Sequence, residues 1–239
     1  LKADISIRIN PDVKVKTHPY IATGMRENKF GIAFEDAFEI YKKAKTLDSI
    51  NIVGIDFHIG SQIMSIEPYL DSISSVKKLI QKLDSIDIKL SHIDVGGGLG
   101  ISYKGEKLVD KSEYVKTIIN SLSDLDLNII FEPGRSIVGD CGLLVSQVQY
   151  VKESRTKNFL IIDASMSELM RPPLYGAYHE ITPTRKGEMP NKVYDVVGPV
   201  CESSDFIGKE RKLNCKSGDL VVIEDVGAYG AVLSSIYYT

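Results

Sequence analysis

Three groups of residues that could carry chemistry each come directly after a short apolar run. They are His58, the glycine-rich turn 96–100, and Glu132-Pro133-Gly134-Arg135. Glycines let a backbone approach a phosphate and point N–H groups at it, and the Pro-Gly pair makes a rigid bend that aims Glu132 and Arg135. Together these groups favour an anion-binding site. Taken singly, the glycine turn could be a tight loop, the Glu-Arg pair an exposed ion pair, and His58 a satisfied loop histidine.

The second half of the chain offers further candidates. Arg171 and Tyr175 lie in a proline-stiffened segment, where an arginine suits bidentate recognition of a carboxylate. Cys201 precedes Glu202, and Tyr229 is presented by a loop of small residues. Each has a structural alternative: a Pro-rich connection, a small buried hydrophobe and a close-packed loop.

Composition narrows the class of protein. The chain has 239 residues, 43% hydrophobic and 26% charged, with a net charge of -3. This is the profile of a globular protein, and no basic block or long apolar run predicts a nucleic-acid or membrane partner. The three widely spaced cysteines fit a reducing compartment, so we expect a cytoplasmic protein without disulfides. Their spacing predicts no metal site.

The elements that must position these residues alternate along the first half. Apolar periodicity predicts strands at residues 5–9, 52–57, 93–95 and 127–131, with helices at 35–47, 66–83 and 114–122 between them. On the last helix the expected buried stripe is Tyr114, Val115, Ile118, Ile119 and Leu122. Such alternation is typical of a parallel sheet, either a β/α barrel or an open doubly wound sheet. In both folds sites form at the carboxyl ends of the strands, where the three groups follow.

The pattern changes after residue 136. Short strand candidates follow at 142–151, 159–162, 193–197 and 220–223, with frequent turn signals and few helical patterns. This predicts a second, all-β domain with a boundary near 138–142. The predicted domains are therefore 1–140 and 141–239.

Considered together, the order and spacing of six segments resemble the diaminopimelate decarboxylase family, within the alanine-racemase-like group of pyridoxal-phosphate enzymes. The segments are 58–62, 94–100, 132–136, 171–179, 201–205 and 227–230. The resemblance implies an α/β fold: strands five to eight of a (β/α)8 barrel, followed by an incomplete C-terminal β-sandwich or β-barrel domain. It also implies a homodimer with shared active sites.

The resemblance assigns roles to individual residues. His58 would stack on the pyridine ring of pyridoxal 5'-phosphate, and Glu132 would contact its nitrogen. The residues implied at the cofactor phosphate are Ser61, Gly97, Gly98, Gly134, Arg135 and Tyr229. For the substrate, the implied ligands are Arg135, Arg171, Tyr175, Glu202 and Tyr229. Cys201, from the partner subunit, would return a proton to the α-carbon.

The implied reaction is decarboxylation of meso-2,6-diaminopimelate to L-lysine. The alternatives are a related decarboxylase of a basic amino acid or carboxynorspermidine, and a non-catalytic remnant. The family's cofactor-anchoring lysine, in a Tyr-Ala-x-Lys-Ala motif, is not found here, so we expect this chain alone to be inactive. Ile236 stands where the family usually has Asn.

Overall fold

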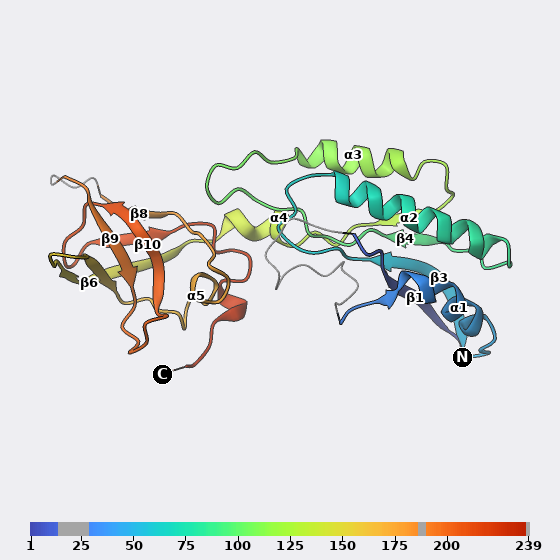
Figure 1. Cartoon of the computed structure of the whole chain (residues 1–239), viewed down its shortest axis with the longest axis horizontal. Coiled ribbons are helices and arrows are strands. Elements are labelled where there is room, and N and C mark those ends of the chain that lie inside the picture. Colours follow the sequence, from blue (N-terminus) through green and yellow to red (C-terminus); the bar gives the residue numbers. More distant parts are fainter. Residues whose placement is uncertain (14–28, 186–189, 238–239) are drawn as a thin grey trace. The chain divides into compact units, whose positions relative to one another are not determined.

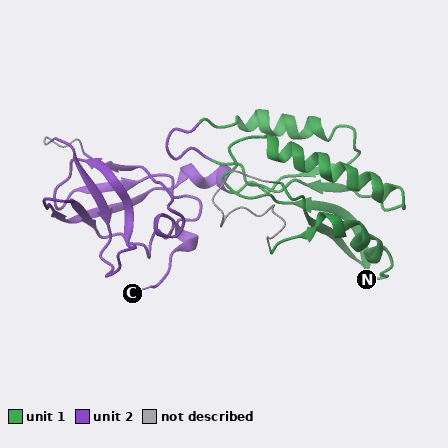
Figure 2. Ribbon diagram, viewed as in Figure 1, with its two compact units in different colours: residues 1–100, 107–134 green, residues 101–106, 135–239 purple. Residues whose placement is uncertain are grey.

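The computed structural model describes residues 1–13, 29–185 and 190–237. Their contacts divide the chain into two compact units (Figure 2): residues 1–100 with 107–134, and residues 101–106 with 135–239. Each unit has its own hydrophobic core. The change of unit at 134/135 falls at the start of the short helix α4 (Arg135–Val138), just before the predicted boundary region.

The first unit is built on a parallel sheet (Figure 1). Its strands lie in the order β2-β1-β3-β4-β5, and every neighbouring pair is parallel. Their bounds are β1 Ala3–Asn10, β2 Ile32–Ala33, β3 Ile50–Phe57, β4 His92–Asp94 and β5 Asn128–Ile130. The α/β fold predicted from the alternating periods is therefore confirmed.

Three helices connect these strands: α1 Phe34–Lys45, α2 Glu67–Asp84 and α3 Lys111–Ser121. Helix α1 buries Ala37, Tyr41 and Ala44, whose spacing places them on one face. The prediction for α3 is wrong in part, because only Tyr114 and Ile118 are buried within that helix.

 Val115 and Ile119 are 38% and 45% exposed, since each lies one position beyond a buried residue and is turned about 100° further around the helix.

The register of the sheet brings the strand ends to one edge. Asp56 of β3 pairs with Asp94 of β4, and Asp94 pairs with Ile130 of β5. Because the strands are parallel and end at matched positions, the segments that follow them leave the sheet side by side. This common edge is where the first-unit candidate residues lie.

The second unit contains a six-stranded sheet in the order β10-β9-β7-β6-β11-β8. The strands are β6 Leu144–Lys152, β7 Phe159–Ile162, β8 Ile181–Pro183, β9 Lys192–Val197, β10 Phe206–Leu213 and β11 Leu220–Ile223. The neighbours pair antiparallel except β7 and β9, which are parallel. The core of this unit lies around Leu160, Val196 and Ile223, each fully buried.

Short helical pieces flank this sheet. They are α4, the 3-10 turn Gly139–Cys141, α5 Arg171–Tyr175 and the 3-10 turn Ala231–Leu233. The segment around Arg171, for which the sequence left a Pro-rich connection open, is thus a helix. Pro172 suits its first turn, where the missing N–H is not needed, and Gly176 ends it in a left-handed conformation at φ 61°.

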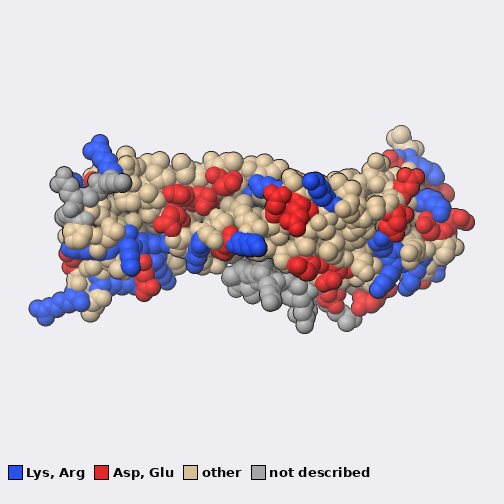
Figure 3. All heavy atoms as spheres, turned by 90° about the horizontal axis from the view of Figure 1, so that it is seen from above, with Lys and Arg blue, Asp and Glu red and all other residues tan. Residues whose placement is uncertain are grey.

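No helix among the described residues is both long enough and apolar enough to cross a membrane. Figure 3 shows lysine and arginine side chains interspersed with aspartate and glutamate over the face in view.

Candidate functional site

The glycine turn after β4 is packed directly on the end of β5. The Glu132 amide donates to the Gly96 carbonyl at 2.9 Å, and a Cβ on Gly97 would lie 2.0 Å from the Glu132 carbonyl oxygen. Gly98 has φ +102°, and its carbonyl accepts a hydrogen bond from the Ile63 amide at 2.9 Å. The turn therefore requires glycine for close approach at Gly97 and for backbone conformation at Gly98.

His58 is held against the same turn. Its Nδ1 accepts a hydrogen bond from the Gly97 amide at 3.3 Å, which places the imidazole proton on Nε2. Burial, followed by the charge of Arg8, lowers the pKa of His58 below its ordinary value. At neutral pH the ring is therefore an uncharged aromatic surface, suited to stack on a flat ligand.

Two acidic residues, Asp94 and Glu132, belong to the same edge of the sheet. Asp94 accepts a hydrogen bond from the Gly96 amide at 2.8 Å and so fixes the start of the turn. Burial raises the pKa of Asp94, and the Glu132 carboxylate acts in the same direction, while the Gly96 bond opposes them. Glu132 itself is exposed at the end of its strand, where it is accessible to a ligand.

The glycine turn is also packed against helix α2 and the loop that precedes it. Tyr69 of α2 is fully buried and donates its hydroxyl to the Gly97 carbonyl at 3.0 Å. Ser61 lies in the half-buried loop between β3 and α2, next to Gly60, whose carbonyl lies 2.2 Å from where a Cβ on Gly98 would be. The structure thus gathers His58, Ser61, Gly97, Gly98 and Glu132 at the carboxyl edge of the first sheet.

In the second unit, Arg135 and Tyr229 lie together. Arg135 is 5% exposed, and its guanidinium carbon lies 4.9 Å from the centre of the Tyr229 ring. Tyr229 takes an uncommon positive φ of 61° and remains 43% exposed. Arg135 Nη1 also donates to the Tyr103 hydroxyl at 2.6 Å.

Arg171 of α5 also lies against Tyr103. Its guanidinium carbon lies 5.0 Å from the centre of the Tyr103 ring, and its Nη1 lies 2.7 Å from His179 Nε2. Burial lowers the pKa of Arg171, and the charge of Arg135 adds to this while the Tyr103 hydroxyl opposes it. Tyr175, one turn later on α5, acts electrostatically on the same guanidinium.

Glu202 and Cys201 form a separate group. Tyr237 donates its hydroxyl to Glu202 Oε1 at 2.6 Å, and the Ser204 hydroxyl donates to Oε2 at 3.1 Å. Cys201 is exposed and carries a free thiol. In the described part of the chain, no hydrogen bond or ion pair links either residue to Arg135 or Arg171.

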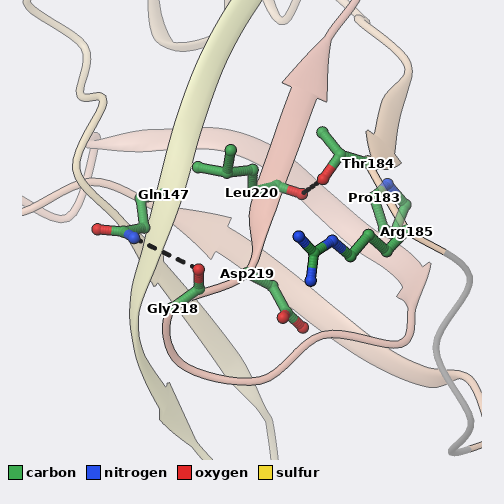
Figure 4. A pocket seen from close by; sticks show the side chains of 7 residues that line it. All are labelled: Gln147, Pro183, Thr184, Arg185, Gly218, Asp219 and Leu220. Carbon is green, nitrogen blue, oxygen red and sulfur yellow. Dashed lines mark hydrogen bonds between the residues drawn. The ribbon is translucent and has the colours of Figure 1, made fainter.

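A hollow of about 260 Å³ in the second unit lies elsewhere (Figure 4). Two hydrogen bonds shape it, from Gln147 Nε2 to the Gly218 carbonyl at 3.3 Å and from the Thr184 hydroxyl to the Leu220 carbonyl at 3.2 Å. It shares no residue with the predicted site. The hollow is therefore distinct from the candidate site in its lining residues.

Three side chains in these clusters were not among the predicted site residues: Tyr103, His179 and Tyr237. Tyr103 lies three residues after the glycine turn and His179 ends the segment 171–179, so position along the chain could have drawn attention to both. Tyr237 is separated from Glu202 by a long stretch of sequence, and its contact had no comparable signal.

Comparisons with known proteins identify the family of this chain. The family model described as "Pyridoxal-dependent decarboxylase, pyridoxal binding domain" matches residues 1–139. A diaminopimelate decarboxylase of Vibrio cholerae is 48% identical over 240 aligned residues, which cover 100% of this chain and 58% of that relative. The chain thus spans about three fifths of the length of the curated relatives it matches.

Solved structures give the same result. The crystal structure of diaminopimelate decarboxylase from Helicobacter pylori complexed with L-lysine matches with a TM-score of 0.95 and 46% identity, covering 100% of this chain and 60% of that one. A diaminopimelate decarboxylase from M. jannaschii in complex with L-lysine matches with a TM-score of 0.91 and 36% identity, covering 99% and 56%. The resemblance seen in the sequence is confirmed, and the chain belongs to the pyridoxal-dependent decarboxylase family.

Proposed function

We propose that this chain contributes to a pyridoxal-phosphate-dependent decarboxylase that converts meso-2,6-diaminopimelate to L-lysine. The relatives named above support this reaction through their names and their bound lysine. The observation in this structure that carries the proposal is the environment of Arg171. This arginine is 6% exposed, and its close partners are Tyr103 and His179, of which burial lowers the pKa of His179 to about 4.

A buried guanidinium without a counter-charge is costly, because a buried charge needs pairing and hydrogen bonds. Over the described ranges 1–13, 29–185 and 190–237, no acidic side chain forms an ion pair with Arg171. A carboxylate from a ligand would supply both the charge and the paired acceptors. The distal carboxylate of diaminopimelate, which the product L-lysine retains and which ornithine lacks as a substrate, is such a group.

The residues of the first unit fit the cofactor. The neutral His58 ring offers a stacking surface, Glu132 an exposed carboxylate, and the glycine turn a backbone that no side chain obstructs. Gly134 has no atom within 4 Å of the position of a Cβ, so the space before its backbone is open to a phosphate. These are the groups that a pyridine ring, its nitrogen and its phosphate require.

When bound, the cofactor supplies a ring that withdraws electrons from the carbanion left by departing carbon dioxide. In the proposed site Glu132 would keep a proton on the pyridine nitrogen, which would strengthen that withdrawal, and His58 would stack on the ring. The phosphate would be held by Ser61, Gly97, Gly98, Gly134, Arg135 and Tyr229. The substrate would be held by Arg135, Arg171, Tyr175 and Tyr229, with Glu202 at its distal ammonium, and Cys201 would return a proton to the α-carbon.

The proposal extends to the whole protein. The parallel sheet supports an assignment of residues 1–140 to part of a β/α barrel, and the six-stranded sheet supports an assignment of 141–239 to the β domain that follows it. The proposed assembly is a homodimer with shared active sites, in which the exposed thiol of Cys201 serves the partner's site. The cysteine usage supports a cytoplasmic location.

The test uses the full-length product of the reading frame that contains these residues, loaded with pyridoxal phosphate. We expect release of carbon dioxide from meso-diaminopimelate, with L-lysine as the product. Carbon dioxide release from carboxynorspermidine or ornithine, but not from meso-diaminopimelate, would contradict the proposed substrate. A protein that binds the cofactor and decarboxylates none of these compounds would favour a non-catalytic remnant.

A further inference from the structure

His179 is a fully buried histidine with a different partner at each ring nitrogen. Nδ1 lies 2.8 Å from the Glu224 carbonyl oxygen, and Nε2 lies 2.7 Å from Arg171 Nη1. A carbonyl only accepts hydrogen bonds and a guanidinium only donates them. Both contacts are satisfied by a single form of the ring, the neutral imidazole with its proton on Nδ1.

We propose that His179 is a positioning residue, which accepts a hydrogen bond from Arg171 and so fixes the guanidinium in the orientation that receives the distal carboxylate of the substrate. This inference rests on the proposed function, because it takes the ligand of Arg171 to be a carboxylate. It adds the residue that sets the direction of the arginine. His179 itself is not placed in contact with substrate or cofactor.

A neutral acceptor suits this task better than an acidic one. An aspartate or glutamate beside Arg171 would orient it equally well, yet it would also neutralise the guanidinium and compete with the carboxylate of the substrate. The imidazole uses one N–H of the five that an arginine carries and leaves the positive charge for the ligand. His179 therefore orients the Arg171 guanidinium without neutralising its charge.

The surroundings keep the imidazole neutral. Burial lowers the pKa of His179 to about 4, and the charges of Arg171, Arg135 and Arg211 act in the same direction, whereas the bond to Glu224 opposes them. The ring therefore keeps its acceptor nitrogen at neutral pH. Protonation would place a second positive charge directly against Arg171.

The hydrogen bonds set the tautomer of His179, and packing fixes the position of its ring. The Tyr103 ring meets it edge-on, with ring centres 5.5 Å apart and planes inclined at 81°. The carbonyl of His179 accepts a hydrogen bond from Arg211 Nη2 at 2.9 Å. Arg171 therefore points toward an acceptor that is anchored at its ring, its far nitrogen and its backbone.

Two substitutions separate this role from a structural one. In His179→Gln the amide oxygen takes the place of Nε2 and can still accept from Arg171, while the bond to the Glu224 carbonyl is lost. In His179→Asn the amide nitrogen takes the place of Nδ1 and can still donate to Glu224, while Arg171 loses its acceptor. Each variant keeps one of the two contacts.

Both variants are assayed in the cofactor-loaded full-length enzyme with meso-diaminopimelate. We expect His179→Asn to raise KM about tenfold with a smaller effect on kcat, and His179→Gln to stay within about threefold of the wild type. The control is Tyr178→Phe, on the neighbouring residue, whose hydroxyl bonds to Glu180 and whose loss should leave KM unchanged. The opposite order, with Asn close to wild type and Gln impaired, would show that the bond to Glu224 is what matters and would overturn the proposal.

A second measurement needs neither activity nor a folded variant. Nitrogen-15 chemical shifts of the wild-type imidazole should report the Nδ1–H tautomer at neutral pH. A proton on Nε2, or on both nitrogens, would overturn the role of His179 whatever the substrate is. An enzyme with the expected tautomer but no decarboxylation of meso-diaminopimelate would instead contradict the proposed function.

Discussion

Tyr103 is the residue that both arginines of the second unit share. Its hydroxyl accepts from Arg135 at 2.6 Å, and its ring lies against Arg171. Tyr103→Phe keeps the ring and removes the acceptor, so Arg135 loses a charged hydrogen bond. We expect KM for the substrate to rise about tenfold, as for a lost hydrogen bond to a charged group of about 1.5 kcal/mol. Steady-state kinetics check this, with the exposed Tyr150→Phe as the control; equal KM values for the two variants would contradict it.

The glycine turn gives a stability prediction. In Gly97→Ala the new methyl group meets the Glu132 carbonyl, which is backbone and cannot swing away. We expect a loss of about 2–3 kcal/mol in the free energy of unfolding, as for an overpacked site. In Gly134→Ala the new methyl group has no atom within 4 Å, so the substitution should change the free energy of unfolding by less than about 0.5 kcal/mol. Urea unfolding of both variants decides it, and similar midpoints would mean that the turn is not packed as described.

His179 gives a pH prediction. Its folded-state pKa of about 4 lies below the ordinary 6.5, so the unfolded chain binds the proton more readily. Stability contributed by the neutral ring is therefore complete above pH 6.5 and is lost as the pH falls toward 4, by about 2–3 kcal/mol at pH 4.5. His179→Gln removes this titration. Its free energy of unfolding should fall less than that of the wild type between pH 7 and 4.5, and equal losses would contradict the buried neutral imidazole.

Sequence alone identified much of the candidate site, because residues that follow parallel strands meet at one edge. His58, the glycine turn and Glu132 could be grouped for that reason, and the structure does place them together. The contact of Arg171 with His179 could not be derived in this way. It depends on how α5 and the segment before β8 fold back on each other, which local periodicity does not describe.

At the scale of elements, helix α3 is capped at its N-terminus by the side chain of Asp110. Asp110 precedes the helix and accepts a hydrogen bond from the Glu113 amide at 2.9 Å, which satisfies one of the unpaired donors of the first turn. Asp110→Ala should lower the free energy of unfolding by about 1 kcal/mol, whereas Asp110→Asn keeps an acceptor and should change it by a few tenths. Denaturant unfolding measures both, and an equal loss in the two variants would exclude the cap as the cause.

The elements that the sequence revealed are those with a clear period. The predicted strands at 5–9, 52–57 and 159–162 correspond to β1, β3 and β7. By contrast, β10 was not predicted, because its central residues Lys209, Glu210, Arg211 and Lys212 break the apolar alternation. It lies at one end of the sheet order, and its pairing with β9 shifts register near Glu210, which has a φ of 54°. Such edge strands tolerate charged residues, which makes them difficult to recognise from sequence.

At the scale of the whole molecule, the two units divide the proposed work. The first carries His58 and Glu132, which we assign to the cofactor, and the second carries Arg171 and His179, which we assign to the selection of the substrate. The chain passes from one unit to the other at 100/101, 106/107 and 134/135. Changes at Arg171 should therefore alter the choice between amino acids while cofactor binding is retained.

The most direct measurement is the ratio of kcat/KM for meso-diaminopimelate to that for D-lysine, which has the same configuration at the reacting carbon but lacks the distal carboxylate. It is determined for the full-length enzyme and for Arg171→Leu. We predict that the wild type prefers meso-diaminopimelate by at least about a hundredfold and that the substitution removes most of this preference. A wild-type enzyme that does not prefer meso-diaminopimelate, or a preference that survives the loss of the Arg171 guanidinium, would contradict the account.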